Sequence, residues 1–165
     1  MPGLVRRGLI AAVVALLCMG TTHHRTAHPQ AQNRPQRILH QEPMVIVTQH
    51  GPVRLMVEMA VTESTRETGL MWRTSVPPFG GMLFDFNPPH PVAFWMHNTI
   101  IPLDMLFIDP NGRIISIARN ARPRDDTPIP SGGVVRGVLE IRGGRAAEIG
   151  VLPGDRVQQR IFTSG

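Results

Sequence analysis

The chain of 165 residues contains no lysine and no tyrosine, and its only cysteine, Cys18, lies near the N-terminus. Without a second cysteine it can form no disulfide within the chain, and a mature protein that begins after Cys18 has no thiolate for catalysis or metal binding. All 17 basic residues are arginine, and the formal net charge is +5. Because these arginines are scattered and aromatic residues are few, we expect no nucleic acid partner.

The N-terminus has the pattern of a secretory signal peptide. Arg6 and Arg7 provide a positive start, and residues 9–19 (LIAAVVALLCM) form an unbroken apolar run. This run is shorter than the roughly 20 residues that a membrane-spanning helix needs. We therefore predict cleavage after Gly20 or Ala31. The protein is then periplasmic or secreted, and it meets the membrane only through this segment before cleavage; an uncleaved anchor is the alternative.

Composition divides the chain into three parts. Residues 1–20 form the predicted signal peptide, and residues 21–41 are polar and rich in His, Arg, Gln and Pro. Such a segment buries too little apolar surface to fold, so we predict a disordered linker. Residues 42–165 alternate apolar stretches with turn residues, which indicates a single mainly β globular domain.

Within this domain the pattern predicts short strands and one or two short helices. The predicted strands lie at 44–49 and 53–61, which form a hairpin, and at 81–86, 92–96, 105–109, 114–118, 134–141 and 156–162. A polar turn at 87–91 separates two of them, and a long polar loop covers 122–133. The fold class is mainly β, a β-rich α+β domain built as a compact sandwich or a partly closed barrel.

The first helix is predicted between Thr62 and Arg73. Thr62 is a suitable N-cap, Ser64 and Glu67 have the spacing of a capping box, and Gly69 is expected to end the helix. A second short helix is predicted at 144–149.

The most distinctive stretch is FWMHNTIIPLD, which begins at Phe94. An apolar strand that passes directly into a polar turn is typical of a pocket rim. The alternative is local turn chemistry, in which Asn and Thr side chains cap the backbone and the Asp accepts backbone N–H bonds. On the first interpretation we predict that the ligand-binding residues are Trp95, His97, Asn98, Thr99 and Asp104.

The carboxylates of the domain suggest a second type of site, one for hydrolysis. Asp104 with Asp109 or Glu140 offers the pair that hydrolysis of a carbohydrate needs. Glu140 alternates with apolar neighbours along its predicted strand. We therefore expect it to face water, or to form a buried structural pair with Arg66 of the first helix.

The methionine thioethers suggest a third type of site, one for copper binding. Met71, Met82 and Met96, with His97, have the soft ligands that Cu(I) prefers. However, methionine commonly fills irregular core space beside aromatic residues, and neighbouring strand residues point to opposite faces of a sheet. We therefore expect these methionines to pack in the core, with no metal site and no cofactor.

Several short motifs together resemble the domain of unknown function 192 family, small domains common in bacteria and archaea. The motifs occur in order over residues 44–162, as GLM (69–71), GMLF (81–84), FWM and NT (94–99), IPLD (101–104), FID (107–109), VLE (138–140) and PGD (153–155). The resemblance implies a compact, mainly β fold and implies no reaction. His97 stands where the family usually has a basic residue, so a role that needs a permanent charge there does not carry over.

Signatures of established enzyme classes, such as G-x-S-x-G, H-E-x-x-H and a phosphate loop, are missing from the sequence. We therefore predict a non-catalytic ligand-binding or accessory protein of the cell envelope. Its pocket lies near Trp95–Asp104, and its partner is an unknown small molecule or envelope component. A small periplasmic hydrolase acting on envelope carbohydrate is the first alternative, and a copper-handling protein is the second.

Removal of the leader is directly testable. Mass spectrometry of the protein isolated from its host should find an N-terminus between Thr21 and Gln32, because both predicted cleavage points give a start in this range. A chain that begins at Met1 and stays in the membrane fraction would contradict cleavage and support the uncleaved anchor.

Overall fold

A computed structural model of the chain describes residues 33–162. The predicted signal peptide and residues 21–32 of the predicted linker lie outside the described residues. Within the described part, no helix is both long enough and apolar enough to cross a membrane.

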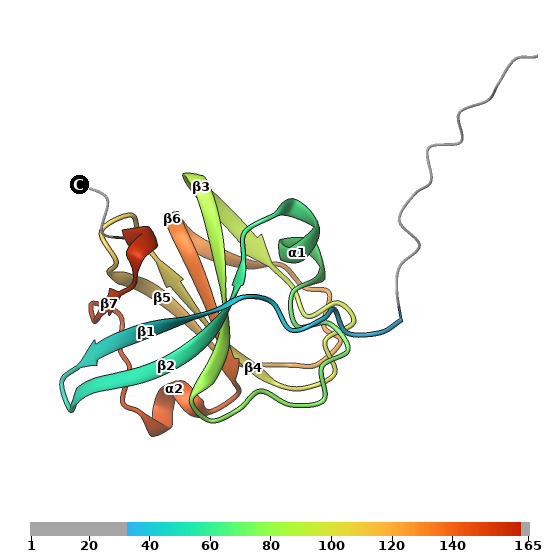
Figure 1. The fold of residues 1–165 in the computed structure, drawn as a ribbon, viewed down its shortest axis with the longest axis horizontal. Coiled ribbons are helices and arrows are strands. Elements are labelled where there is room, and N and C mark those ends of the chain that lie inside the picture. Colours follow the sequence, from blue (N-terminus) through green and yellow to red (C-terminus); the bar gives the residue numbers. More distant parts are fainter. Residues whose placement is uncertain (1–32, 163–165) are drawn as a thin grey trace, which may run out of the picture. The chain divides into compact units, whose positions relative to one another are not determined.

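The described residues form seven strands in one sheet, with the order β5-β4-β6-β3-β2-β1-β7. Neighbouring strands are antiparallel except β2 and β3, which are parallel. The sheet curls, and a bridge between Arg113 and Arg156 joins its two edges at one point (Figure 1). The mainly β fold class is therefore confirmed, in the form of a partly closed barrel. The strands are β1 (Gln41–Thr48), β2 (Gly51–Ala60), β3 (Gly80–Phe94), β4 (Leu103–Ile108), β5 (Ile114–Ala121), β6 (Ile129–Arg142) and β7 (Arg156–Gln158).

Two short α-helices and one 3-10 helix complete the domain: α1 (Glu63–Thr68), α2 (Arg145–Glu148) and η1 (Arg160–Phe162). The helix α1 begins after Thr62 and is followed by Gly69, as predicted. The predicted capping box of Ser64 and Glu67 is wrong. The Thr62 hydroxyl accepts from the Thr65 backbone N–H, and the Thr65 hydroxyl accepts from the Thr62 N–H, so the box lies nearer the helix start.

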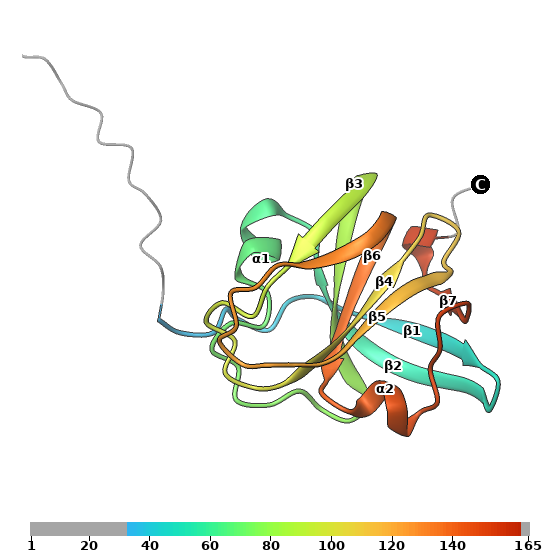
Figure 2. The ribbon, with the colours of Figure 1, turned by 180° about the vertical axis from the view of Figure 1, so that it is seen from behind.

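The strand β3 departs from the prediction. The turn predicted at 87–91 does not end it, and one strand runs from Gly80 to Phe94. Its pairing with β6 shifts register between Asp85 and His90, and this irregularity accommodates the proline-rich segment that a regular ladder would exclude. Because β3 ends at Phe94, Trp95 and Met96 lie beyond it. The strands β3, β6, β4 and β5 can be followed from behind in Figure 2.

The strand β4 and the adjoining residues 80–84 of β3 and 137–141 of β6 are covered on both faces. One hydrophobic cluster, the barrel core, receives side chains from all seven strands, including Leu83, Leu106 and Leu139. A second cluster, the outer core, contains their sequence neighbours Met82, Met105 and Val138, with Leu70, Val76 and Met96 from loops over them. Side chains alternate across a strand, so continuous apolar runs such as MLF and VLEI supply both clusters at once.

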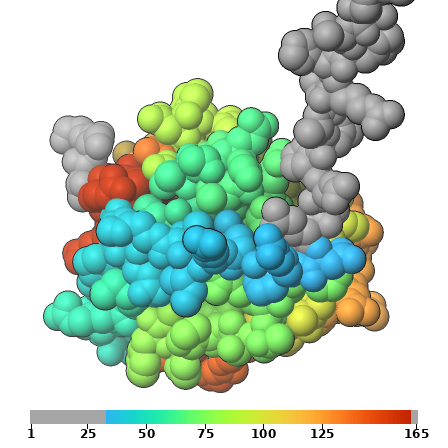
Figure 3. Space-filling model, turned by 45° about the vertical axis from the view of Figure 1, so that its right-hand side comes forward, coloured from blue at the N-terminus to red at the C-terminus, as the bar shows by residue number. Residues whose placement is uncertain are grey.

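Contacts of the domain extend upstream of β1. The Gln36 side-chain amide donates to the Gly69 carbonyl at 2.8 Å, and the Leu39 N–H donates to the Glu58 carboxylate at 2.8 Å. Glu58 is in turn paired with Arg73 at 2.9 Å. Figure 3 shows the segment from residue 33 as a band across one face of the domain. This end of the predicted linker therefore contacts both α1 and β2.

The C-terminal end of the domain contacts its first strand, β1. The strand β7 pairs with β1, and Arg160 binds the Glu42 carboxylate through two of its nitrogens, at 2.7 and 2.6 Å. Hydrogen bonds from Arg160 lower the pKa of Glu42. The first and last strands of the domain are therefore joined at the sheet edge.

Asp104 connects three parts of the barrel. Its side chain is fully buried in β4 and accepts backbone N–H bonds from Asn120 at 2.7 Å, Gly144 at 3.1 Å and Ala146 at 2.7 Å. These donors belong to β5 and to the start of α2. A buried carboxylate that satisfies several backbone donors fixes the positions of the segments that carry them.

We expect Asp104→Asn to reduce the free energy of unfolding by roughly 2–4 kcal/mol, because hydrogen bonds to a charged group contribute about 1.5–3 kcal/mol each and the new amide faces a backbone donor. Denaturant unfolding measures the loss. The matched control is Asp109→Asn. Asp109 accepts two backbone N–H bonds through Oδ1 alone, which asparagine retains. A loss for Asp104→Asn no larger than that of this control would contradict the role given to Asp104.

Candidate functional site

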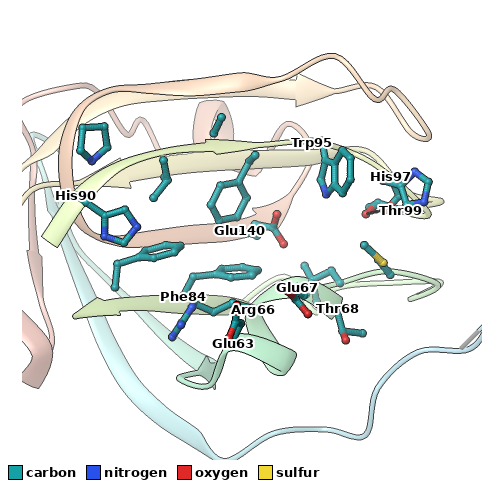
Figure 4. Close-up of a pocket in the computed structure, with 18 residues that line it drawn as sticks. Glu63, Arg66, Glu67, Thr68, Phe84, His90, Trp95, His97, Thr99 and Glu140 are labelled. Carbon is teal, nitrogen blue, oxygen red and sulfur yellow. Dashed lines mark hydrogen bonds between the residues drawn. The ribbon is translucent and has the colours of Figure 1, made fainter. Parts of the chain in front are cut away.

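A pocket of 990 Å³ lies between α1 with its following loop and the second half of β3 (Figure 4). One wall comes from α1 and from Gly69, Leu70 and Met71, and the opposite wall comes from residues 90–95, with His97 and Thr99 at the end. The deep part is formed by Phe84 of β3 and Glu140 of β6. The volume is within the range of pockets that bind small molecules.

Glu140 is the most unusual group in this pocket. It is 5% exposed, and within the described residues no hydrogen bond or ion pair is made by its carboxyl group. In β6 it sits between Met82 of β3 and Met105 of β4, so it occupies an outer-core position. Figure 4 shows its carboxyl group reaching into the space between Trp95 and Glu67.

The predictions that Glu140 faces water or pairs with Arg66 are both wrong. Leu139 and Ile141 point into the barrel core, and the face that Glu140 shares with Val138 is covered by the outer core rather than by solvent. The Arg66 guanidinium donates instead to the carbonyls of Val61 at 2.7 Å and Asp85 at 3.0 Å, and it lies over the Phe86 ring.

Burial raises the pKa of Glu140 to about 8. Desolvation is the cause, because removing a carboxylate from water disfavours its ionised form, and no cation in the described part of the chain compensates for it. Carboxyl groups with a raised pKa inside a pocket are characteristic of functional sites, where they bind a charged partner or transfer a proton.

The walls around Glu140 are rich in aromatic rings. Phe94 makes edge-to-face contacts with Phe84 at 4.9 Å and with Phe86 at 6.2 Å. Trp95, at the pocket entrance, is 52% exposed and stacks on His97 at 5.0 Å. A half-exposed indole beside a cavity offers a ligand apolar area at little entropic cost.

Backbone hydrogen bonds hold the entrance in place. The N–H of Met96 donates to the Asp125 carbonyl, and the N–H of Arg124 donates to the Thr99 carbonyl. The N–H of Trp72 donates to the Asn98 carbonyl at 2.9 Å, which ties the loop after α1 to the turn after β3. Asn98 has a φ of 55°, a left-handed conformation that asparagine tolerates well. The two walls are therefore connected where they meet.

Three of the five predicted ligand-binding residues lie at the pocket, and two lie elsewhere. Trp95, His97 and Thr99 line the pocket, whereas Asn98 and Asp104 do not. Asn98 supports the turn through its backbone carbonyl, and its side-chain amide contacts Met71 Sδ at 4.0 Å instead of capping the backbone. Asp104 accepts backbone N–H bonds, as the turn-chemistry alternative describes. His97 also contacts Asp126 at 2.9 Å on the surface.

Among the methionines considered for copper, Met71 lines the pocket, while Met82 and Met96 are fully buried in the outer core. Within residues 33–162 no group of three or more His, Cys, Asp or Glu residues is placed to hold a metal ion. Met82 and Met96 are therefore core side chains, whereas Met71 faces the pocket.

Comparisons with known proteins place these observations in context. The family model for domain of unknown function 192, described as an uncharacterised ACR, matches residues 45–159. A protein from Sinorhizobium meliloti, described as a candidate transcription regulator, is 42% identical, with a TM-score of 0.73 over 76% of this chain and 98% of its own. A protein of unknown function from Novosphingobium aromaticivorans is 40% identical, with a TM-score of 0.72 over 80% of this chain and 90% of its own. Among curated proteins none matches.

The raised pKa of Glu140 predicts a pH dependence of stability. The pKa is about 8 in the folded protein against an ordinary value of 4.5, so between these values the folded state keeps a proton that the unfolded chain has released. The free energy of unfolding should therefore fall as the pH rises through this window, and it should level off above it. The total decrease should be about 1.4 kcal/mol for each unit by which the two pKa values differ.

Glu140→Gln removes the ionisable group, so the variant should gain stability relative to the wild type as the pH is raised from about 5 to about 9. Denaturant unfolding of both proteins across this range gives the difference. Glu67→Gln, a second carboxyl group of the pocket lining, is the matched control for the substitution itself. A constant difference between Glu140→Gln and the wild type would show that Glu140 ionises normally.

Proposed function

This chain belongs to the domain of unknown function 192 family, and we propose that it is an exported ligand-binding or accessory protein of the cell envelope. Its ligand, a small molecule or an envelope component, occupies the pocket between α1 and β3. Export is supported by the basic and apolar leader at residues 1–19.

One observation carries the proposal: the buried carboxyl group of Glu140, which has no hydrogen-bond or ion-pair partner among residues 33–162, lies inside a pocket of about 990 Å³. An unpaired buried polar group reduces stability, so such a group is usually retained where it acts on something outside the protein. Aromatic side chains surround it, and a few polar groups converge on the same space. This combination is typical of small-molecule sites.

A periplasmic hydrolase acting on envelope carbohydrate is the second candidate function. The raised pKa of Glu140, about 8, favours it, because a carboxyl group that stays protonated near neutral pH can act as a general acid. The carboxylate pair first considered for this chemistry is occupied: Asp104 and Asp109 both accept backbone N–H bonds. A second carboxylate would have to come from Glu63 or Glu67 at the pocket wall.

Regulation of transcription, the role in the description of the Sinorhizobium protein, is not the role we propose here. Nucleic acid binding depends on a concentrated basic surface. Several described arginines are instead paired with carboxylates, as Arg73 with Glu58, Arg136 with Asp85, Arg142 and Arg145 with Glu148, and Arg160 with Glu42.

The proposal predicts that small molecules bind at this pocket and that Trp95 contributes to binding. Protein isolated from its host should carry a bound compound in native mass spectrometry, and fragment screening by NMR should shift the signals of Leu70, Trp95 and Thr99. Trp95→Ala should weaken the best fragment about tenfold, because stacking on an aromatic ring contributes roughly 1 kcal/mol or slightly more.

Phe79→Ala is the matched control, because Phe79 is 63% exposed and does not line this pocket. It should leave fragment affinity unchanged. Fragments that shift signals elsewhere on the domain, or that bind Trp95→Ala as tightly as the wild type, would contradict the proposed site.

A further inference from the structure

The charges of the pocket are unbalanced. Three carboxyl groups line it, from Glu63, Glu67 and Glu140, against one guanidinium, that of Arg66. Arg66 is already engaged by two backbone carbonyls and by the Phe86 ring. The pocket therefore presents acceptor oxygens and negative charge without a mobile cation of its own.

The two histidines of the pocket are engaged elsewhere. His90 Nδ1 contacts the Pro88 carbonyl oxygen at 2.8 Å, and His97 Nδ1 contacts Asp126. Neither side chain makes an ion pair with Glu140 among the described residues. These two, with Glu63, Arg66 and Glu67 of α1, are the titratable groups that face Glu140 across the pocket.

From this arrangement we infer that the pocket takes an organic cation with N–H donors, such as a primary ammonium or guanidinium group, whose charged head contacts the carboxyl group of Glu140. The inference rests on the proposed function and names its ligand class. The carboxyl groups of Glu63 and Glu67 on the wall disfavour an anion, whereas a cation with N–H donors satisfies the acceptor oxygens of Glu140.

The aromatic walls favour the same ligand class. Cations are attracted to the faces of aromatic rings, and the attraction grows when water is excluded. Phe84, Phe86, Phe94 and Trp95 all line the pocket, and Arg66 over Phe86 at 5.5 Å shows such a contact within the protein itself. An apolar body attached to the cationic head would lie along these rings toward the entrance.

Binding of a cation is coupled to the proton on Glu140. Below a pH of about 8 this group is mostly protonated in the free protein, and a bound cation stabilises its ionised form. Each binding event therefore releases a proton. Below pH 8, affinity should increase by up to about tenfold for each unit by which the pH is raised. Above pH 8 it should level off, because the carboxyl group of Glu140 is then already ionised in the free protein.

Calorimetric titration with matched probes tests the inference. Benzylammonium carries a charged head with N–H donors, benzyltrimethylammonium is a cation without them, and benzyl alcohol is uncharged. Benzylammonium should bind at least about tenfold more tightly than the other two, which corresponds to about 1.4 kcal/mol. Titrations in buffers of different ionisation enthalpy should show the release of up to one proton.

Two variants locate the effect. Glu140→Gln should abolish the preference for benzylammonium and the proton release while it still binds benzyl alcohol, and its thermal unfolding should remain cooperative. Asp109→Asn, outside the pocket, is the control: it keeps both backbone hydrogen bonds through Oδ1 and should leave benzylammonium affinity unchanged, since a distant carboxylate on the surface interacts weakly with a cation.

Equal binding of benzyl alcohol and benzylammonium at the pocket, without proton release, would overturn the cation inference and leave the proposed ligand-binding function standing. Binding of no probe at the pocket would also overturn the inference. The proposed function would then depend on the compound found in protein from the host.

Discussion

Burial of both faces of the central strands is the constraint on which the rest of the structure depends. The strand β4, residues 80–84 of β3 and residues 137–141 of β6 stand between the barrel core and the outer core, so the side chains along these stretches enter one of two buried layers. Close approach is part of this arrangement: a Cβ on Gly81 would lie 2.6 Å from the Glu140 carbonyl oxygen. A polar side chain in one of these buried stretches is shielded from bulk solvent. It must be satisfied within the protein or face a cavity.

Asp104 and Glu140 represent the two solutions to this constraint. Both are carboxyl groups on central strands, and both are buried. Asp104 accepts three backbone N–H bonds and organises the start of α2 and the end of β5. Glu140 receives no such hydrogen bonds from the residues that the structure describes, and the space in front of it is the pocket. A buried carboxyl group therefore stabilises the fold at Asp104, whereas at Glu140 it marks a candidate binding site.

Local signals in the sequence predicted the local structure well. Gly51 marks the β1–β2 hairpin, Thr62 and Gly69 bound α1, and turn residues separate most strands. What the sequence could not show was the second apolar layer. Alternation of Glu140 with Leu139 and Ile141 is the pattern of a half-exposed strand, and only the loop residues Leu70, Val76 and Met96, distant in sequence, reveal that the other face is covered. The sequence therefore predicts the entrance of the pocket at Trp95, His97 and Thr99. It gives no sign that Glu140 is buried in the same pocket.

The contact between the two ends of the domain has a consequence for how the chain acquires its structure. Glu42 and Arg160 are separated by 118 residues, and β7 completes the sheet edge beside β1. Closure of such a long loop is entropically costly, and folds dominated by distant contacts form slowly. The barrel therefore cannot close on a ribosome-bound chain whose last residues are still missing.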